Sequence, residues 1–216
     1  MKIIQSCMAL LLLPSLLLAG CASKIPEPSW RANAASSLDG YTDAYLKGNT
    51  VSAENDFARA HYEMASTGRA DMVAHAELVR CAVRTASLDF GECTGFTALA
   101  QDASAEERAY AAYLTGRWQG LDSKLLPEQH RAIANGTGGL AGMTDPLARL
   151  VAAGAMLQAK RIAPPDIVTA TDTASAQGWR RPLLMWLAVS QERALALGDT
   201  AEVERIRRRI AIASAK

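Results

Sequence analysis

The chain has 216 residues, half of them hydrophobic, and carries 23 basic and 22 acidic side chains, for a net charge of +1. This balance gives no electrostatic reason to expect nucleic acid as a partner, nor adhesion to an anionic membrane surface, because both need a clear excess of basic residues.

The first 21 residues have the pattern of an export signal. Lys2 is followed by an apolar run over residues 8–18, and the small residues Ala19 and Gly20 come directly before Cys21. The run is shorter than the roughly 20 apolar residues of a membrane-spanning helix. A positive start, an apolar run and a small-residue cleavage site are typical of a signal peptide that is removed on export. An ordinary secretory signal that happens to end in cysteine is the alternative.

The order Leu-Ala-Gly-Cys at residues 18–21 resembles the lipobox of bacterial lipoproteins. The resemblance implies that the thiol of Cys21 is acylated and that Cys21 becomes the mature N-terminus, so this lipid is the expected attachment to the membrane. Residues 22 and 23 are Ala and Ser rather than Asp, which by the same resemblance favours the outer membrane with the body facing the periplasm. We therefore divide the chain into a signal peptide (1–20), a lipid-anchored tether (21–30) and an α-helical repeat-like domain (31–216).

The remaining cysteines predict a disulfide. Cys7 leaves with the signal peptide and Cys21 is lipidated, so Cys81 and Cys93 remain as a pair. Two cysteines in an oxidising periplasm usually join, and closing a loop of this length is worth about 3 kcal/mol in the chain-entropy model. A metal site and a redox dithiol are the alternatives. The three histidines have no ligand spacing near either cysteine, and a redox pair is normally Cys-x-x-Cys, so we expect a structural disulfide and no bound metal.

Beyond residue 30 the sequence predicts helices throughout. Alanine is abundant, and no segment alternates between apolar and polar residues over the length of a strand. Helix starts are marked by a capping box at Ser104 and Glu107, by Asp145 before a proline, and by Asp199 three residues before Glu202. Short glycine and proline breaks separate the predicted helices, which are 31–47, 50–66, 70–87, 104–118, 124–135, 146–160, 165–177, 182–197 and 200–213.

Helices of this length joined by short turns are typical of hairpins stacked in series. Gly48-Asn49, followed by Ala53, Phe57 and Ala60, resembles the second half of a tetratricopeptide repeat. The segments 145–178 and 179–212 each have the 34-residue length of that repeat. The resemblance covers residues 34–67 and 145–212 and lacks the usual Trp-Leu-Gly. Residues 88–103 are predicted to form an irregular link that holds Cys93. The expected fold class is therefore all-α, a short tetratricopeptide-like solenoid, with an irregular α-helical bundle as the alternative.

The motifs of common catalytic sites are missing from the sequence. It has no Gly-x-Ser-x-Gly elbow, no His-Glu-x-x-His and no phosphate loop ending in Gly-Lys-Ser/Thr. The glycine-rich stretch 135–142 lacks the lysine that would follow a phosphate loop, and it is interpreted as a connection between helices. We therefore expect no catalytic residue and no cofactor.

Two clusters of exposed cations are candidates for partner binding. One follows the break at Gly178, and the other lies on the polar face of the last helix, where Glu204 and Arg208 can pair at i, i+4. A solvated helix face explains the second cluster equally well, and cation–π packing of Trp179 on its own surface explains the first. The candidate partner-binding residues are Trp179, Arg180, Arg181, Arg205, Arg208 and Arg209.

These features together suggest a non-enzymatic scaffold. A lipid-anchored helical solenoid in the periplasm is expected to bind a protein or peptide partner in envelope assembly, secretion or cell-wall maintenance. A peptidoglycan-acting enzyme, or an activator of one, is an alternative that only the location supports. A purely structural lipoprotein is the third.

The lipid anchor gives the first testable prediction. Replacing Cys21 by Ser removes the thiol that is acylated, so the variant should accumulate as an uncleaved or a soluble species. Fractionation of the envelope followed by mass measurement checks this. A Cys21→Ser chain that still sediments with the outer membrane would contradict the prediction.

Overall fold

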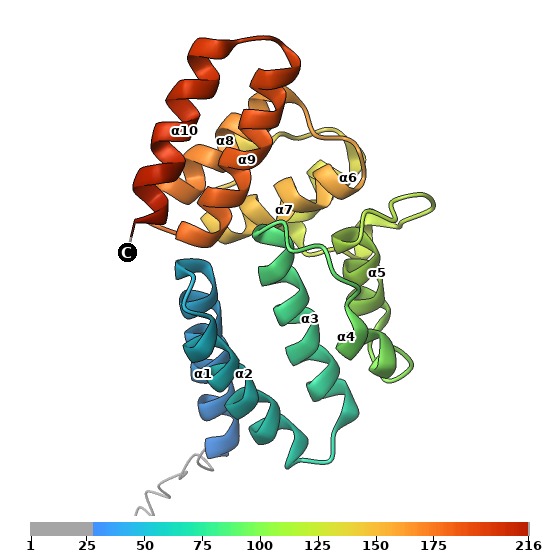
Figure 1. The fold of residues 1–216 in the computed structure, drawn as a ribbon. Helices are drawn as coiled ribbons and strands as arrows, with labels where there is room; N and C mark the ends of the chain where they lie inside the picture. The colour runs from blue at the N-terminus through green and yellow to red at the C-terminus, as the bar shows by residue number, and fades with distance from the viewer. Residues whose placement is uncertain (1–27, 216) are drawn as a thin grey trace, which may run out of the picture.

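The computed structural model describes residues 28–215, so the predicted signal peptide, Cys21 and the tether up to residue 27 lie outside the described residues. The described part is all-α, as predicted, with helices packed against one another and no strand in this range (Figure 1). It contains two 3-10 turns, η1 (Ser123–Leu125) and η2 (Leu140–Gly142). The α-helices are α1 (Ser29–Lys47), α2 (Thr50–Ala65), α3 (Ala70–Ala86), α4 (Thr94–Leu99), α5 (Ala105–Leu114), α6 (Glu128–Asn135), α7 (Pro146–Gln158), α8 (Pro164–Ala176), α9 (Arg180–Ala196) and α10 (Thr200–Ser214).

The helix starts follow the capping residues of the sequence. The Ser104 hydroxyl accepts a hydrogen bond from the Glu107 N–H at 3.1 Å, and the Glu107 carboxylate accepts one from the Ser104 N–H at 2.9 Å. Asp145 caps α7 through the N–H of residue 148 at 2.7 Å. Each cap satisfies a backbone donor that a helix start otherwise leaves without a partner. The predicted helix 124–135 is wrong as one piece, because Pro127 separates η1 from α6.

The link over residues 88–103 is less irregular than predicted. It contains the short helix α4, whose Phe96 is buried in the core. The predicted disulfide between Cys81 and Cys93 is confirmed, with the two Cα atoms 5.6 Å apart. It ties the start of α4 to the middle of α3. Helix α4 was not predicted, since a helix of six residues is too short to show a hydrophobic period.

The hairpin of α1 and α2 has the small-aromatic-small packing that the sequence predicted. Gly48 adopts a left-handed conformation at the end of α1, with φ of 88°, which a glycine reaches without steric cost. Ala53, Phe57 and Ala60 are buried, and Phe57 is only 5 % exposed. Its ring centroid lies 5.4 Å from that of Tyr41 on α1, and the Arg80 guanidinium of α3 sits 4.5 Å above it. Phe57 therefore fills the space between its own hairpin and the next helix.

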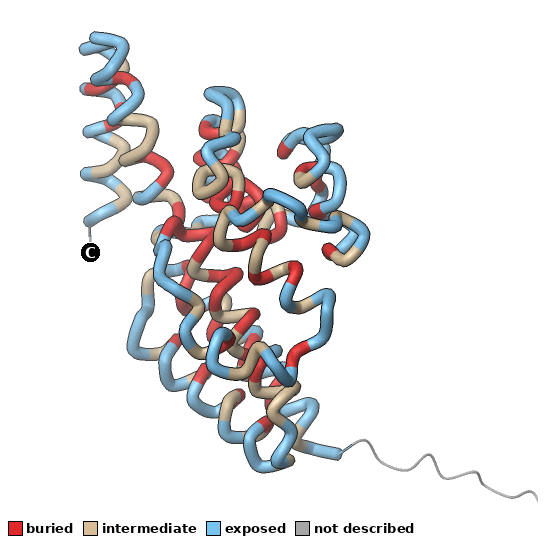
Figure 2. The backbone as a smooth tube through the Cα atoms, turned by 90° about the vertical axis from the view of Figure 1, so that its right-hand side faces the viewer, coloured by how far each residue is buried: buried red, intermediate tan, exposed pale blue. Residues whose placement is uncertain are grey.

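The two halves of the molecule meet where α3 crosses α7. Gly154 on α7 faces the backbone of α3 so closely that a Cβ there would overlap the carbonyl oxygen of Thr85. Figure 2 shows the buried backbone gathered around this centre, while α10 is largely exposed. A second, smaller apolar cluster joins α9 to α10 through Leu187, Ala194, Val203 and Ile206. The C-terminal hairpin therefore depends on far fewer buried side chains than the centre does.

None of the helices between residues 28 and 215 is both long enough and apolar enough to cross a membrane.

The packing of α2 gives the second prediction. Phe57→Ala should lower the free energy of unfolding by about 3–5 kcal/mol, because it empties a buried aromatic site. Ala53→Leu should lower it by about 1–3 kcal/mol through overpacking. Urea unfolding followed by circular dichroism measures both effects.

Matched controls lie on the same helix. Tyr62 is 73 % exposed and Ala58 is exposed, so Tyr62→Ala and Ala58→Leu should unfold close to the parent. If Phe57→Ala and Ala53→Leu unfold like these controls, α2 does not pack as described.

Candidate functional site

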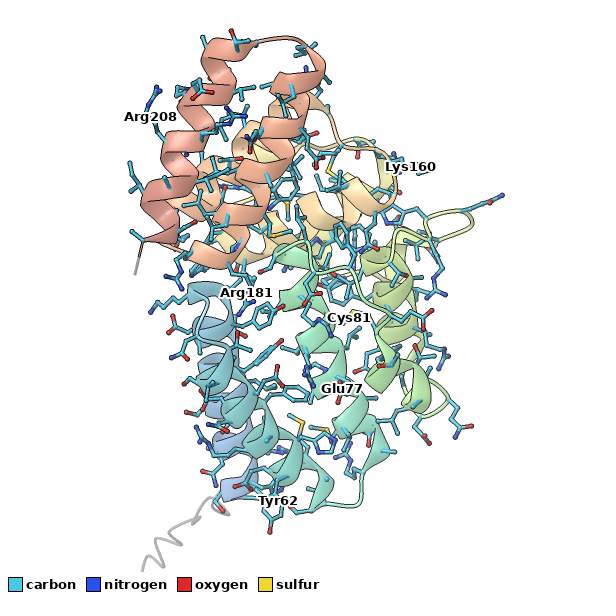
Figure 3. All side chains as sticks on the ribbon, viewed as in Figure 1. Tyr62, Glu77, Cys81, Lys160, Arg181 and Arg208 are labelled. Carbon is cyan, nitrogen blue, oxygen red and sulfur yellow. A yellow bond between two sulfur atoms is a disulfide. The ribbon has the colours of Figure 1, made fainter. Side chains whose placement is uncertain are left out.

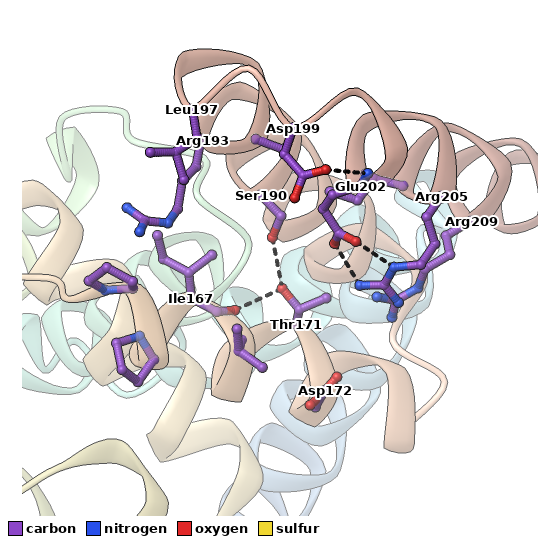
Figure 4. Close-up of a pocket in the computed structure, with 15 residues that line it drawn as sticks. Ile167, Thr171, Asp172, Ser190, Arg193, Leu197, Asp199, Glu202, Arg205 and Arg209 are labelled. Atoms are coloured by element: carbon purple, nitrogen blue, oxygen red, sulfur yellow. Dashed lines mark hydrogen bonds and ion pairs between the residues drawn. The ribbon is translucent and has the colours of Figure 1, made fainter.

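The helices α8, α9 and α10 enclose an open cleft near the C-terminus, with a volume of about 530 Å³ (Figure 4). We call it the C-terminal cleft. Its floor consists of the buried apolar residues Ile167, Ala194 and Ile206, one from each helix. Val168 and Leu197 also line it and are mostly exposed. An apolar floor in a cleft of this size is typical of a binding site.

The hydroxyl groups in the floor are already hydrogen-bonded. Thr171 donates to the Ile167 carbonyl at 2.8 Å, and Ser190 donates to the Trp186 carbonyl at 2.8 Å. The two hydroxyl oxygens lie 3.4 Å apart. Because each hydroxyl group donates to a carbonyl of its own helix, neither is free to donate a hydrogen bond to a ligand.

The rim of the cleft carries three arginines and three acidic residues. Arg205 binds the Glu202 carboxylate through two hydrogen bonds of 2.6 Å, which lower the pKa of Glu202. Asp199 accepts a hydrogen bond from the Glu202 N–H at 3.0 Å and so caps α10. These three charged groups therefore have partners within their own helix.

The other charged groups of the rim are unpaired. Among the residues that the structure describes, Arg193, Arg209 and Asp172 make no direct hydrogen bond or ion pair through their side chains, although Arg209 acts electrostatically on Glu202 and Asp172 on Arg205. Two cations and one anion are thus available to a ligand in the cleft.

The candidate residues of the last helix divide between two faces of α10. Arg205 and Arg209 line the C-terminal cleft, whereas Arg208 is exposed and points away from it (Figure 3). The predicted pair of Glu204 with Arg208 is wrong, because Glu204 pairs with Arg207 at i, i+3. The arginine cluster is therefore not one patch.

Arg181 is used inside the molecule. Its Nε donates to the Tyr45 carbonyl at 2.7 Å, its Nη2 donates to the Thr50 hydroxyl at 2.7 Å, and the guanidinium lies 4.1 Å from the Tyr45 ring centroid. Figure 3 shows it between the start of α9 and the hairpin of α1 and α2. Arg180 lies beside Gly48 in the same junction, and Trp179 is half-buried against the core. Arg180 and Arg181 therefore lie at the junction of α9 with the N-terminal hairpin, and none of the three residues lines the C-terminal cleft.

A second cleft, of about 610 Å³, lies between α3, α5, α6 and α7. His130 is part of its wall and is only 1 % exposed. Burial lowers the pKa of His130 to about 4, so its imidazole is neutral near pH 7. The ring packs 5.5 Å from that of Tyr110 and 5.1 Å from that of Tyr113. His130 therefore belongs to an aromatic cluster of the core with Tyr110, Tyr113 and Trp118, and the sequence did not predict that these rings come together.

Between residues 28 and 215 no three His, Cys, Asp or Glu side chains are placed to hold a metal ion.

Sequence reasoning missed part of the C-terminal cleft. It did not single out Arg193 or Asp172, and it did not place the apolar floor. One signal was available for Asp172: it is an acidic residue in the middle of α8, not in a first turn, where the helix dipole would explain it. For Arg193 there was none, since a basic residue in the last turn of a helix is ordinary.

No family model, curated protein or solved structure matches this chain.

The contacts of Arg181 give the third prediction. Arg181→Ala should lower the free energy of unfolding by about 1.5–3 kcal/mol, because it removes hydrogen bonds from a charged group at the junction of α9 with the hairpin. Arg208→Ala should change it by less than about 0.5 kcal/mol, as expected for an exposed side chain. Equal urea midpoints for the two variants would contradict the contacts described for Arg181.

Proposed function

We propose that this protein is a lipid-anchored periplasmic adaptor that holds a protein or peptide partner in the C-terminal cleft, in envelope assembly, secretion or cell-wall maintenance. The observation that carries the proposal is the combination of an open apolar floor with three unpaired charged groups on the rim. An apolar floor supplies binding energy, and unpaired charges on its border supply selectivity. Arg205 and Arg209 keep their predicted role as partner-binding residues in this proposal.

The dimensions of the cleft suit a peptide. Along α10 it extends from Asp199 to Arg209, which at 1.5 Å per residue is about 15 Å. That length takes four or five residues of extended chain at about 3.3 Å each. Stacked helical hairpins commonly bind peptides in grooves of this kind.

The chemistry of the cleft favours recognition over catalysis. The side chains that line it include no histidine, cysteine or lysine. Its two hydroxyl groups, on Thr171 and Ser190, donate to helix carbonyls, so neither directs its proton to a general base. The Glu202 carboxylate is held by Arg205 and kept ionised, which is the reverse of what a general acid needs.

The anchor and the compartment are supported by other parts of the chain. The lipobox resemblance at residues 18–21 supports attachment through Cys21, and residues 22 and 23 support the outer membrane. The disulfide of Cys81 with Cys93 is in keeping with an oxidising compartment. An adaptor fixed to the membrane by its N-terminus would present the cleft at the opposite end of the body.

Site-directed photo-crosslinking tests the proposal and is the fourth prediction. A photoreactive amino acid at Val168, inside the cleft, should give a discrete protein adduct when the full chain is made in its own bacterium. The control position is Val51 on α2, which is 75 % exposed and lies outside the cleft. No adduct at Val168, or the same adducts at both positions, would overturn the proposal.

A further inference from the structure

We propose that the C-terminal cleft selects an acidic peptide segment, with an aliphatic side chain on its floor and a carboxylate bound to Arg193. This inference rests on the proposed function and gives the partner its chemistry. It follows from which charges of the cleft are already satisfied and from where the unsatisfied ones lie.

The net charge of the cleft does not by itself show which ligand charge it prefers. Its rim has three arginines and three acidic residues, so a simple sum gives no preference. Glu202 and Arg205 neutralise each other through two short hydrogen bonds, and Asp199 is bound to the first turn of α10. The remaining three charges have no direct hydrogen bond or ion pair among the described residues.

The remaining charges are distributed unevenly. Figure 4 shows Arg193 close to Leu197 and Ile167 at one end of the cleft, with Arg209 beside Arg205 at the opposite end and Asp172 below Thr171. Arg209 acts electrostatically on Glu202, and Asp172 acts on Arg205, so the two arginines and two carboxylates of this end sum to zero charge. At the other end, the only acidic group among the lining residues close to Arg193 is Asp199, which is already the cap of α10.

A carboxylate is the natural partner for an unpaired guanidinium. The planar guanidinium donates two parallel hydrogen bonds to a carboxylate, and such charge-assisted bonds are about twice as strong as neutral ones. Leu197 lies beside Arg193, and Leu197 and Val168 both expose apolar surface in the cleft to an aliphatic neighbour of that carboxylate. A lysine in the same place would meet Arg193 with like charge, so basic segments should bind less tightly at this end.

Fluorescence anisotropy with three labelled octapeptides tests this inference, which is the fifth prediction. All three share a leucine–valine centre, and their flanks are glutamate, glutamine or lysine. With the full chain purified from envelopes in detergent, the glutamate peptide should bind at least tenfold more tightly than the glutamine peptide. The lysine peptide should bind most weakly, and the differences should shrink as salt is raised from 50 to 500 mM, because salt screens exposed charges.

Four variants assign the effect to particular side chains. Arg193→Gln should remove the preference for the glutamate peptide, whereas Arg209→Gln should reduce it by less. Asp172→Asn should strengthen binding of the glutamate peptide, because it removes the free carboxylate of the cleft. Arg208→Gln is the matched control on the outer face of α10 and should change nothing.

The outcomes separate this inference from the proposed function. Equal binding of the three peptides, tighter binding of the lysine peptide, or equal losses in Arg193→Gln and Arg208→Gln would overturn acidic selectivity. If the Val168 cross-link still forms in envelopes, the adaptor proposal survives that result. If neither the cross-link nor peptide binding is seen, both proposals fall.

Discussion

The close contact of α3 with α7 sets the positions of both halves of the molecule. Gly154 allows the backbone of α7 to approach Thr85 on α3 to a distance that any side chain would prevent. From this crossing, α3 packs against α2, α4 and α5, and α7 packs against α5, α6 and α8. Because interiors are close-packed, a shift at this point would propagate to both ends of the stack. The irregular middle of the chain is thus organised around one tight helix pair.

A polar network complements this crossing on the side of the N-terminal hairpin. The Tyr45 hydroxyl donates to Asp89 at 2.7 Å, Arg84 binds the same carboxylate, and Arg181 lies over the Tyr45 ring. Burial and the bond to Asp89 raise the pKa of Tyr45 to about 12, so the phenol keeps its proton and remains a donor. Asp89 lies in the segment that the disulfide closes, between Cys81 and Cys93. The disulfide therefore holds in place the carboxylate on which the network centres.

The C-terminal cleft exists because the end of the chain is packed less completely. Only four buried apolar side chains join α9 to α10, and the middle of α10 is rich in exposed arginines. A helix with so narrow an apolar stripe covers its neighbour on one side only. The uncovered side, facing α8, is where the apolar floor and the unpaired arginines meet. The proposed binding site is therefore a direct consequence of the composition of the last helix.

The sequence by itself determined the features that depend on neighbours a few residues apart. Capping residues located the helix starts, Gly48-Asn49 placed the first turn, and the spacing of Ala53, Phe57 and Ala60 identified a buried face. The disulfide was predicted because Cys81 and Cys93 are the two cysteines that remain once Cys7 and Cys21 are assigned to the signal peptide and the lipid. Only the tertiary structure decided the role of each arginine, because the partners of Arg181 are about 130 residues away and those of Arg205 lie in its own helix. It alone also showed α4 and the floor of the C-terminal cleft. Hydrogen bonds and packing between residues a few positions apart require particular residue types at fixed spacings, so they can be recognised in the sequence. A contact between helices far apart in the chain depends instead on how all the intervening segments pack.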